Sequence, residues 1–172
     1  MPSLISPAIP SGPYSATWNG TDIGLFEGVI RLQQNINGLP VRASQWGQTV
    51  IDYILSGGGA FGVFVLKEWT SASKRFLWPF GNGISGLPDL GLLPPPGVFL
   101  SSYSAPLVLT ALAGTQAATY GPVTRTYPYV ASLPGHNFDL LFGPMERNTV
   151  VAVAVLPQSD GSTRQARLFT DT

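Results

Sequence analysis

Short runs of β-branched and aromatic residues, separated by turn-forming residues, constrain the fold of this chain more than any other feature. Val, Ile, Phe and Tyr suit a pleated, half-buried surface, whereas Gly, Pro, Asn and Asp suit the turns between strands. We therefore expect a mainly β protein, an antiparallel β-sandwich or barrel. The last third of the chain reads PLVLTALAG, VTRTYPYVASL, NFDLLFG, NTVVAVAVLP and TRQARLFTD.

Two hairpins are predicted from turn signals. The run GVIRLQQN, which starts at Gly28, alternates with period two and predicts a strand. Asn37 and Gly38 suit a tight turn after it, and LPVRAS supplies a second short extended segment. Asp160 and Gly161, between the last two runs, give the strongest turn signal in the chain.

One segment in the first half has a helical period. A spacing of four, seven and eight residues relates Trp46, Val50, Tyr53 and Ile54. Ser44 can cap such a helix and Gly57 can end it, so we expect one short flanking α-helix near residues 47–55.

The next segments predict a strand and a further helical turn. AFGVFVLKEW, from Ala60, is β-branched and aromatic, and we expect it to form a central strand. Thr70 then opens TSASKRFLWPF, one or two helical turns that Pro79 ends because its ring clashes with the preceding turn.

The two Pro-rich segments are expected to make contacts between subunits. Residues 1–15 form an extended N-terminal arm, and 16–172 a single domain with a loop insertion at 81–106 that is dense in Gly and Pro. Loops of that length usually serve function or interaction. A merely disordered terminus is the alternative for residues 1–15.

The composition indicates an assembling subunit. Only 10% of the 172 residues are charged, against about 25% in an ordinary soluble domain. So few charges suggest that much of the surface meets protein rather than water. The net charge is zero, which argues against an electrostatically driven nucleic-acid binder. The start of the chain does not read as a signal peptide, and no apolar run is long enough for a membrane helix, so we expect no membrane partner.

No residue pattern predicts an enzyme. The chain has one histidine, His136, in a turn-rich stretch, and no cysteine or GxSxG motif. GNGISG at 81–86 satisfies GxGxxG but opens no helix. Without a cluster of metal-ligand residues we expect no cofactor and no metal.

Four motifs in order resemble the tail tube proteins of long-tailed, siphovirus-like bacteriophages. They are NGTDIGLFEGVIRL, GQTVIDYILSGG, a strand ending FVLKEW, and DLLFGPMERNTVVAVAVLP. The resemblance covers roughly residues 16–70 and 137–169, and 81–106 has no counterpart. Within these motifs the expected assembly contacts are Asp22, Glu27, Glu68, Glu146 and Arg147.

The resemblance implies a structural virion protein. Subunits of that family form a β-sandwich or barrel flanked by a helix, and stack as hexameric rings around a channel for DNA. It further implies partners such as the tape measure, the tail terminator and the baseplate or hub, assembly in the host cytoplasm, and DNA that passes without sequence-specific binding.

Two other classes of function remain open from the sequence. One is another virion component, such as a tube initiator, a tail completion or head–tail joining protein, or a capsid decoration protein. The other is a carbohydrate-binding β-sandwich, suggested by Trp18, Trp46, Trp69 and Trp78.

Overall fold

The computed structural model describes residues 13–27, 30–43, 49–81, 93–113, 123–135, 149–159 and 166–172. Everything below concerns these ranges. The expected N-terminal arm up to residue 12 and the Asp160–Gly161 turn lie outside them, as does the whole of NFDLLFG. So do several residues singled out in the sequence: Trp46, His136, Glu146 and Arg147.

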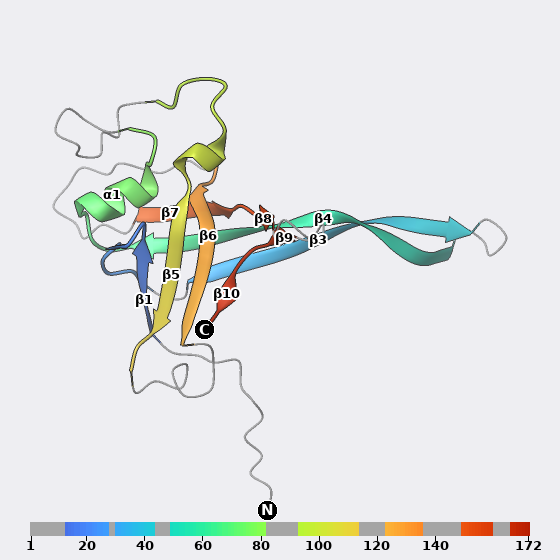
Figure 1. The fold of residues 1–172 in the computed structure, drawn as a ribbon, viewed down its shortest axis with the longest axis horizontal. Helices are drawn as coiled ribbons and strands as arrows, with labels where there is room; N and C mark the ends of the chain where they lie inside the picture. The colour runs from blue at the N-terminus through green and yellow to red at the C-terminus, as the bar shows by residue number, and fades with distance from the viewer. Residues whose placement is uncertain are drawn as a thin grey trace, which may run out of the picture.

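The described chain is mainly β, with one antiparallel sheet of eight strands (Figure 1). The strand order is β2-β1-β5-β6-β7-β4-β3, and β10 pairs with β6 beside this path. The strands are β1 (Tyr14–Trp18), β2 (Thr21–Asp22), β3 (Arg31–Ala43), β4 (Thr49–Leu66), β5 (Ala105–Ala111), β6 (Thr124–Ser132), β7 (Thr149–Val155) and β10 (Thr170–Asp171). A separate pair joins β8 (Gln158–Ser159) to β9 (Ala166–Arg167). The expected mainly β fold with one short flanking α-helix is confirmed.

Residues 23–27 join the two ends of this sheet. The Ile23 amide donates to the Ala16 carbonyl on β1 at 3.1 Å, so the segment starts at one end of the strand order. Three residues later Phe26 bridges Leu66 on β4, near the other end. The sheet is therefore curled, and Ile23 is completely buried where its ends approach.

Aromatic side chains fill the inside of the curl. Trp18 packs edge-to-face against Phe76 with the ring centroids 6.0 Å apart, and Phe76 packs against Phe64 at 5.1 Å. The buried Trp18 indole donates through Nε1 to the Val130 carbonyl at 3.0 Å, which ties β1 to β6. Such edge-to-face pairs add stability beyond their buried area.

The helix α1 (Ser71–Leu77) begins where the sequence predicted, after Thr70. The Ser73 amide donates to Thr70 Oγ1 at 3.1 Å, and the Thr70 amide donates to Ser73 Oγ at 2.8 Å. This capping box satisfies two amides that a helix start otherwise leaves without partners. The helix ends before Pro79, and its buried Phe76 and Leu77 place it against the core.

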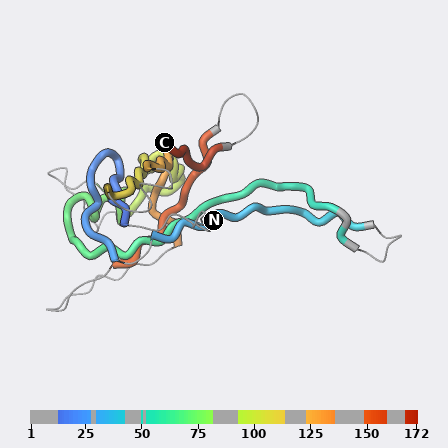
Figure 2. The backbone as a smooth tube through the Cα atoms, turned by 90° about the horizontal axis from the view of Figure 1, so that it is seen from below, coloured from blue at the N-terminus to red at the C-terminus, as the bar shows by residue number. Residues whose placement is uncertain are grey.

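The β3–β4 hairpin extends far beyond the sheet. β4 pairs with β7 only from Ala60 to Leu66, whereas it pairs with β3 along nearly its whole length. Residues 35–43 and 49–59 therefore form a two-stranded ribbon that projects from the rest of the molecule (Figures 1 and 2). We call this ribbon the arm and the remainder the body.

The predicted helix near 47–55 is wrong, because residues 49–55 belong to β4. Asp52 pairs with Val41 and Ile54 with Leu39, in register with β3. The apolar spacing that suggests a helix arises because the arm carries apolar side chains on both faces, which removes the two-residue period of an ordinary half-buried strand.

The predicted turn at Asn37–Gly38 is also wrong. β3 continues through both residues, and the register shifts between them. Asn-Gly therefore marks an irregularity of the β-bulge kind within a strand, a position where an extra residue on the partner strand is accommodated. β3 ends at Ala43 and β4 begins at Thr49, and residues 44–48 lie outside the described ranges.

The remaining strand predictions are confirmed where they are described. AFGVFVLKEW contributes the central part of the sheet through β4, and the three described runs of the last third form β5, β6 and β7. β8 and β9 pair as the last hairpin predicts. β1 begins at Tyr14, so the last two residues of the expected extended N-terminal segment, 1–15, belong to a strand.

Candidate functional site

Three of the expected assembly residues lie where residues 23–27 approach and pair with the end of β4. We call this place the crossing. Asp22 Oδ1 accepts a hydrogen bond from the Gly24 amide at 2.9 Å and so holds the turn. Gly24 has φ +85°, and a Cβ there would lie 2.5 Å from Glu68 Oε2. Glycine thus allows both the turn and the close approach of Glu68. The structure brings Asp22, Glu27 and Glu68 to one crossing, although Glu68 is distant in sequence.

Glu27 is held on the same crossing by backbone and side-chain contacts. Its amide donates to the Val65 carbonyl at 2.7 Å, and its Oε2 lies 3.4 Å from Lys67 Nζ. The carboxylate is about half exposed. Partly exposed ion pairs of this kind stabilise a folded chain only weakly. Breaking the pair between Glu27 and Lys67 to form a contact with another molecule would therefore cost little free energy. Glu146 and Arg147 lie outside the described residues.

The acidic side chains at the crossing do not form a metal-binding cluster among the described residues. Across the ranges that the structure describes, no group of three His, Asp or Glu side chains could hold a metal ion. Asp22 is committed to its turn and Glu27 to Lys67. The crossing is therefore a charged surface whose side chains are held in place by these contacts.

The arm exposes six apolar side chains on its two faces. Ile36 is 79% exposed and Leu55 71%. Neighbouring residues of a strand point to opposite faces, so Leu55 and Ile54 lie on different faces of the ribbon. Soluble monomers rarely expose contiguous apolar patches of this kind unless they bind something. The exposed apolar side chains of the arm are Ile36, Leu39, Val50, Tyr53, Ile54 and Leu55.

Both long edges of the arm are open as well. Among the described residues, 49–59 of β4 pair only with β3, and 35–43 of β3 pair only with β4. An isolated two-stranded hairpin is marginally stable in water, and open edges are sites for pairing with another chain. The arm therefore has both the side chains and the backbone groups of a binding element.

Glycines keep the two strands of the arm close at its base. Gly57 has φ +115°, and Asn35 Oδ1 accepts a hydrogen bond from the Gly59 amide at 3.0 Å. A Cβ at Gly58 would collide with the Asn35 carbonyl oxygen. The SGGG stretch is therefore a place of close backbone approach, not the end of a helix.

A second apolar surface lies on the outer face of the body. Phe61 on β4, Tyr129 on β6 and Val150 on β7 are each about two-fifths exposed, whereas Phe64 and Val151 face the core. β7 lies between β4 and β6, so the three exposed side chains belong to neighbouring strands. The same chain thus presents an apolar arm and, on the outer face of the body, three partly exposed apolar side chains beside the buried Ala131 and Ala152.

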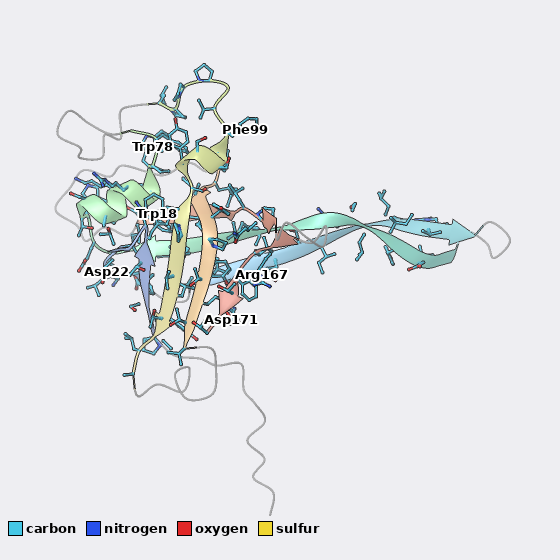
Figure 3. The ribbon with its side chains drawn as sticks, in the orientation of Figure 1. Trp18, Asp22, Trp78, Phe99, Arg167 and Asp171 are labelled. Carbon is cyan, nitrogen blue, oxygen red and sulfur yellow. The ribbon has the colours of Figure 1, made fainter. Side chains whose placement is uncertain are left out.

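A third apolar surface lies at the end of the body where β5 begins, and it is formed by residues just before the expected loop insertion 81–106 and by residues within it. Trp78 and Phe80 pack edge-to-face at 4.9 Å, and Phe80 packs on Tyr103 at 5.1 Å. Tyr103 ends the short 3-10 helix η2 (Leu100–Tyr103). Phe99, just before η2, is 81% exposed, and Trp78 and Phe99 lie at the same end of the body (Figure 3).

The C-terminal strand is fixed to the body by Arg125. Its Nε and Nη2 donate to the two carboxylate oxygens of Asp171 at 2.6 and 2.7 Å, and its Cζ lies 4.4 Å from the Phe169 ring centroid. The bidentate hydrogen bond raises the pKa of Arg125 above its ordinary value. Burial raises the pKa of the neighbouring Tyr127 phenol.

The three described tryptophans lie in different surroundings. Trp18 is buried in the core, Trp78 belongs to the aromatic stack, and Trp69 lies 5.6 Å from Lys74 Nζ with about two-fifths of its area exposed. Trp46 lies outside the described residues.

Sequence reasoning located the acidic residues but missed the arm. Its signal was present in Tyr53, Ile54 and Leu55, three consecutive apolar side chains that no single buried face can accommodate in a strand. No helix among the described residues has the length and apolar character needed to cross a bilayer. No model of a known protein family matches the sequence, and no curated protein matches it significantly.

Proposed function

We propose that this protein is a structural virion protein, the tail tube subunit of a tailed bacteriophage, which assembles with copies of itself into stacked hexameric rings around a channel for DNA. The proposal joins the resemblance of its ordered motifs to one structural observation. That observation is the arm, which exposes apolar side chains on both faces and open strands on both edges.

The arm has enough apolar surface to drive association. Burying one large apolar side chain contributes about 1.5–3 kcal/mol, and the arm offers several that are more than half exposed. Association costs roughly 4–15 kcal/mol in lost translational and rotational freedom. Burial of Ile36, Leu39, Tyr53, Ile54 and Leu55 together is of the size that offsets this cost.

The position of the second apolar surface favours a ring over a simple two-fold dimer. The arm and the outer face of the body are unlike surfaces of one chain, and contacts between unlike surfaces generate rings or open filaments. A subunit that places its arm on the outer face of its neighbour leaves its own outer face free for the next arm. Six-fold closure is what the resemblance implies.

The composition supports a surface that is mostly covered in the assembly. Charged residues make up 10% of the chain, and the charges at the crossing of residues 23–27 are positioned but only partly exposed. In the proposed tube, the assembly contacts are Asp22, Glu27, Glu68, Glu146 and Arg147. The role requires no catalytic group, cofactor or metal.

The proposed partners follow from the same resemblance. The tape measure, the terminator and the baseplate or hub would meet the tube inside or at its ends, and genomic DNA would pass through the lumen. A net charge of zero fits passage without retention, since strong binding to phosphates requires clustered Lys and Arg.

Electron microscopy and light scattering of the purified protein test the proposal. We expect rings or tubes from the natural sequence. The double variant Ile36→Ser/Leu55→Ser should remain monomeric, because it removes apolar side chains from the arm that are 79% and 71% exposed in the monomer. Loss of about 3–6 kcal/mol of burial corresponds to at least a hundredfold weaker association.

The matched control is Val123→Ser, which also removes an exposed apolar side chain but lies on the body. It should form rings as the natural sequence does, because the arm is unchanged. A natural-sequence protein that stays a monodisperse monomer at high concentration contradicts the proposal. Single rings that never stack, or binding only to preformed capsids, would indicate an initiator, a completion or a decoration protein instead of the tube subunit.

A further inference from the structure

The aromatic stack at the β5 end of the body has features of a docking surface. The ring of Phe80 packs edge to face against both Trp78 and Tyr103. All three side chains are partly exposed. We call these three rings, together with the exposed Phe99, the aromatic platform. Grooves lined by aromatic rings are the surfaces on which Pro-rich segments dock in a polyproline II conformation.

The platform lies on an ordered support. The Ser102 amide donates to the Phe99 carbonyl at 3.0 Å, and Ser104 Oγ donates to the Ser101 carbonyl at 2.7 Å. Phe99 is nevertheless 81% exposed. A large aromatic side chain held outward on a hydrogen-bonded turn is placed for contact with another chain.

The chain itself contains a Pro-rich segment that fits such a platform. Pro7, Pro10 and Pro13 recur every three residues in PAIPSGP. A polyproline II helix has three residues per turn, so in that conformation these three prolines share one face. Residues 1–12 carry no charged side chain, and neither does the sequence around the platform, 93–104. The two segments are therefore matched in polarity.

Strand register places the segment and the platform at opposite ends of the body. Tyr14 pairs with Ala111 and Trp18 with Leu107, so the chain enters β1 at the end of β5. The Leu112 amide also donates to the Pro13 carbonyl at 3.1 Å. The platform precedes the start of β5 at Ala105, about 20 Å away at roughly 3.4 Å per residue.

We propose that residues 7–13 of one copy dock in polyproline II conformation on the aromatic platform of the next copy along the tube. This inference rests on the stacking of subunits proposed above. When copies stack head to tail, the Pro13 end of one body meets the platform end of the next. Docking on its own platform would require the segment to reverse at Pro13 and run back along the whole of β1 and β5.

A peptide experiment tests the docking independently of tube formation. The probe is a labelled synthetic peptide, MPSLISPAIPSGP, and the receptor is the full chain with Pro7→Ser and Pro10→Ser, whose own segment no longer competes. We expect saturable binding by fluorescence polarisation. Binding should weaken at least tenfold when Phe99→Ser is added to the receptor, or when serines replace Pro7 and Pro10 of the peptide.

Two controls isolate the platform and the three-residue spacing. Val123→Ser in the receptor, at the opposite end of the body, should leave peptide binding unchanged. A peptide with Pro2→Ser should bind normally, because Pro2 does not share the three-residue period. Thermal unfolding of the Phe99→Ser receptor should match that of its parent, since the ring is exposed. The docking is overturned if the peptide does not bind the parent receptor. It is also overturned if neither the Phe99→Ser receptor nor the peptide with serines at positions 7 and 10 binds more weakly than its parent.

Stacking of the assembled protein gives the second readout. Rings of the Pro7→Ser/Pro10→Ser variant and rings of the Phe99→Ser variant should each fail to stack. A mixture of the two should give pairs of rings, because one intact segment then meets one intact platform. Docking within a single copy predicts no such pairs, so their absence overturns the proposal.

The outcomes separate this inference from the proposed function. If the natural chain forms no rings and yet the peptide binds the platform, the tube proposal fails and the docking is supported. If rings form and both variants stack into tubes of natural length, the docking fails and the tube proposal stands.

Discussion

The body and the arm share strand β4 but follow opposite rules of burial. Within the body, Phe64 and Leu66 of β4 are almost fully buried and alternate with more exposed residues. Within the arm, Ile54 and Leu55 of the same strand are both exposed. The difference shows that the described body has a buried core, whereas the described arm has none of its own.

The largest expected effect is in the body, at Phe64. Phe64→Ala should destabilise the protein by about 3–5 kcal/mol, because it removes a buried ring that packs on Phe76. Phe61→Ala, on the same strand and the opposite face, is the matched control and should cost less than about 1.5 kcal/mol. Urea unfolding followed by fluorescence measures both, and equal losses would contradict the division of faces described for β4.

A smaller loss is expected at the indole that joins β1 to β6. Trp18→Phe removes the hydrogen bond from Nε1 to the Val130 carbonyl and leaves that oxygen without this partner in the core. The expected cost is about 1–3 kcal/mol. Trp69→Phe, at a ring that is 41% exposed, should cost less than about 0.5 kcal/mol. Thermal unfolding of both variants distinguishes a structural indole from a surface one.

Alkaline pH should weaken the body through Tyr127. Burial raises the pKa of its phenol above the ordinary value near 10, so the folded chain holds the proton more tightly than the unfolded chain does. The stabilisation is complete below about pH 10 and is lost as pH rises through the folded pKa, by up to about 1.4 kcal/mol per pH unit. Tyr127→Phe should flatten this decline in urea unfolding measured from pH 9 to 11.5. A variant that declines as steeply as the natural sequence would show that another group controls it. Tyr53→Phe, at an exposed ring of the arm, is the control.

The smallest expected effect on the monomer is in the arm. Ile36→Ser/Leu55→Ser should change the free energy of unfolding of the isolated monomer by less than about 0.5 kcal/mol, because both side chains are already in water. The same variant is expected to abolish assembly. Calorimetry of dilute monomer checks the first statement, and a loss comparable to Phe64→Ala would show that the arm is packed even without partners.

The body could be predicted from sequence because its local signals and its packing agree. The run from Ala60 has β-branched and aromatic residues in a buried strand, and Thr70 caps a helix that Pro79 ends. Each signal reports a local constraint that the curled sheet also satisfies. The joining of the sheet ends at Ile23 could not be predicted, since it depends on pairing between residues far apart in sequence.

The arm could not be predicted by the same reasoning. Periodicity identifies a strand only when one face is buried and the other is wet, and the segment from Val50 to Leu55 has apolar side chains on both faces. Asn37–Gly38 carries a turn signal, but pairing with β4 keeps β3 extended through it. Of the expected contacts, Asp22, Glu27 and Glu68 meet at one crossing because Gly24 permits it, which no spacing in the sequence reveals.

The continuity of β4 from the arm into the body has a mechanical consequence. The ladder with β7, from Ala60–Val155 to Leu66–Thr149, lies along the direction in which a pull on the arm would act. Its backbone hydrogen bonds would then be loaded together in shear rather than opened one after another. In the proposed assembly, tension on the arm would pass into the body of the same chain along the continuous strand β4, and the rate of forced unfolding of that body would limit the load that the chain sustains.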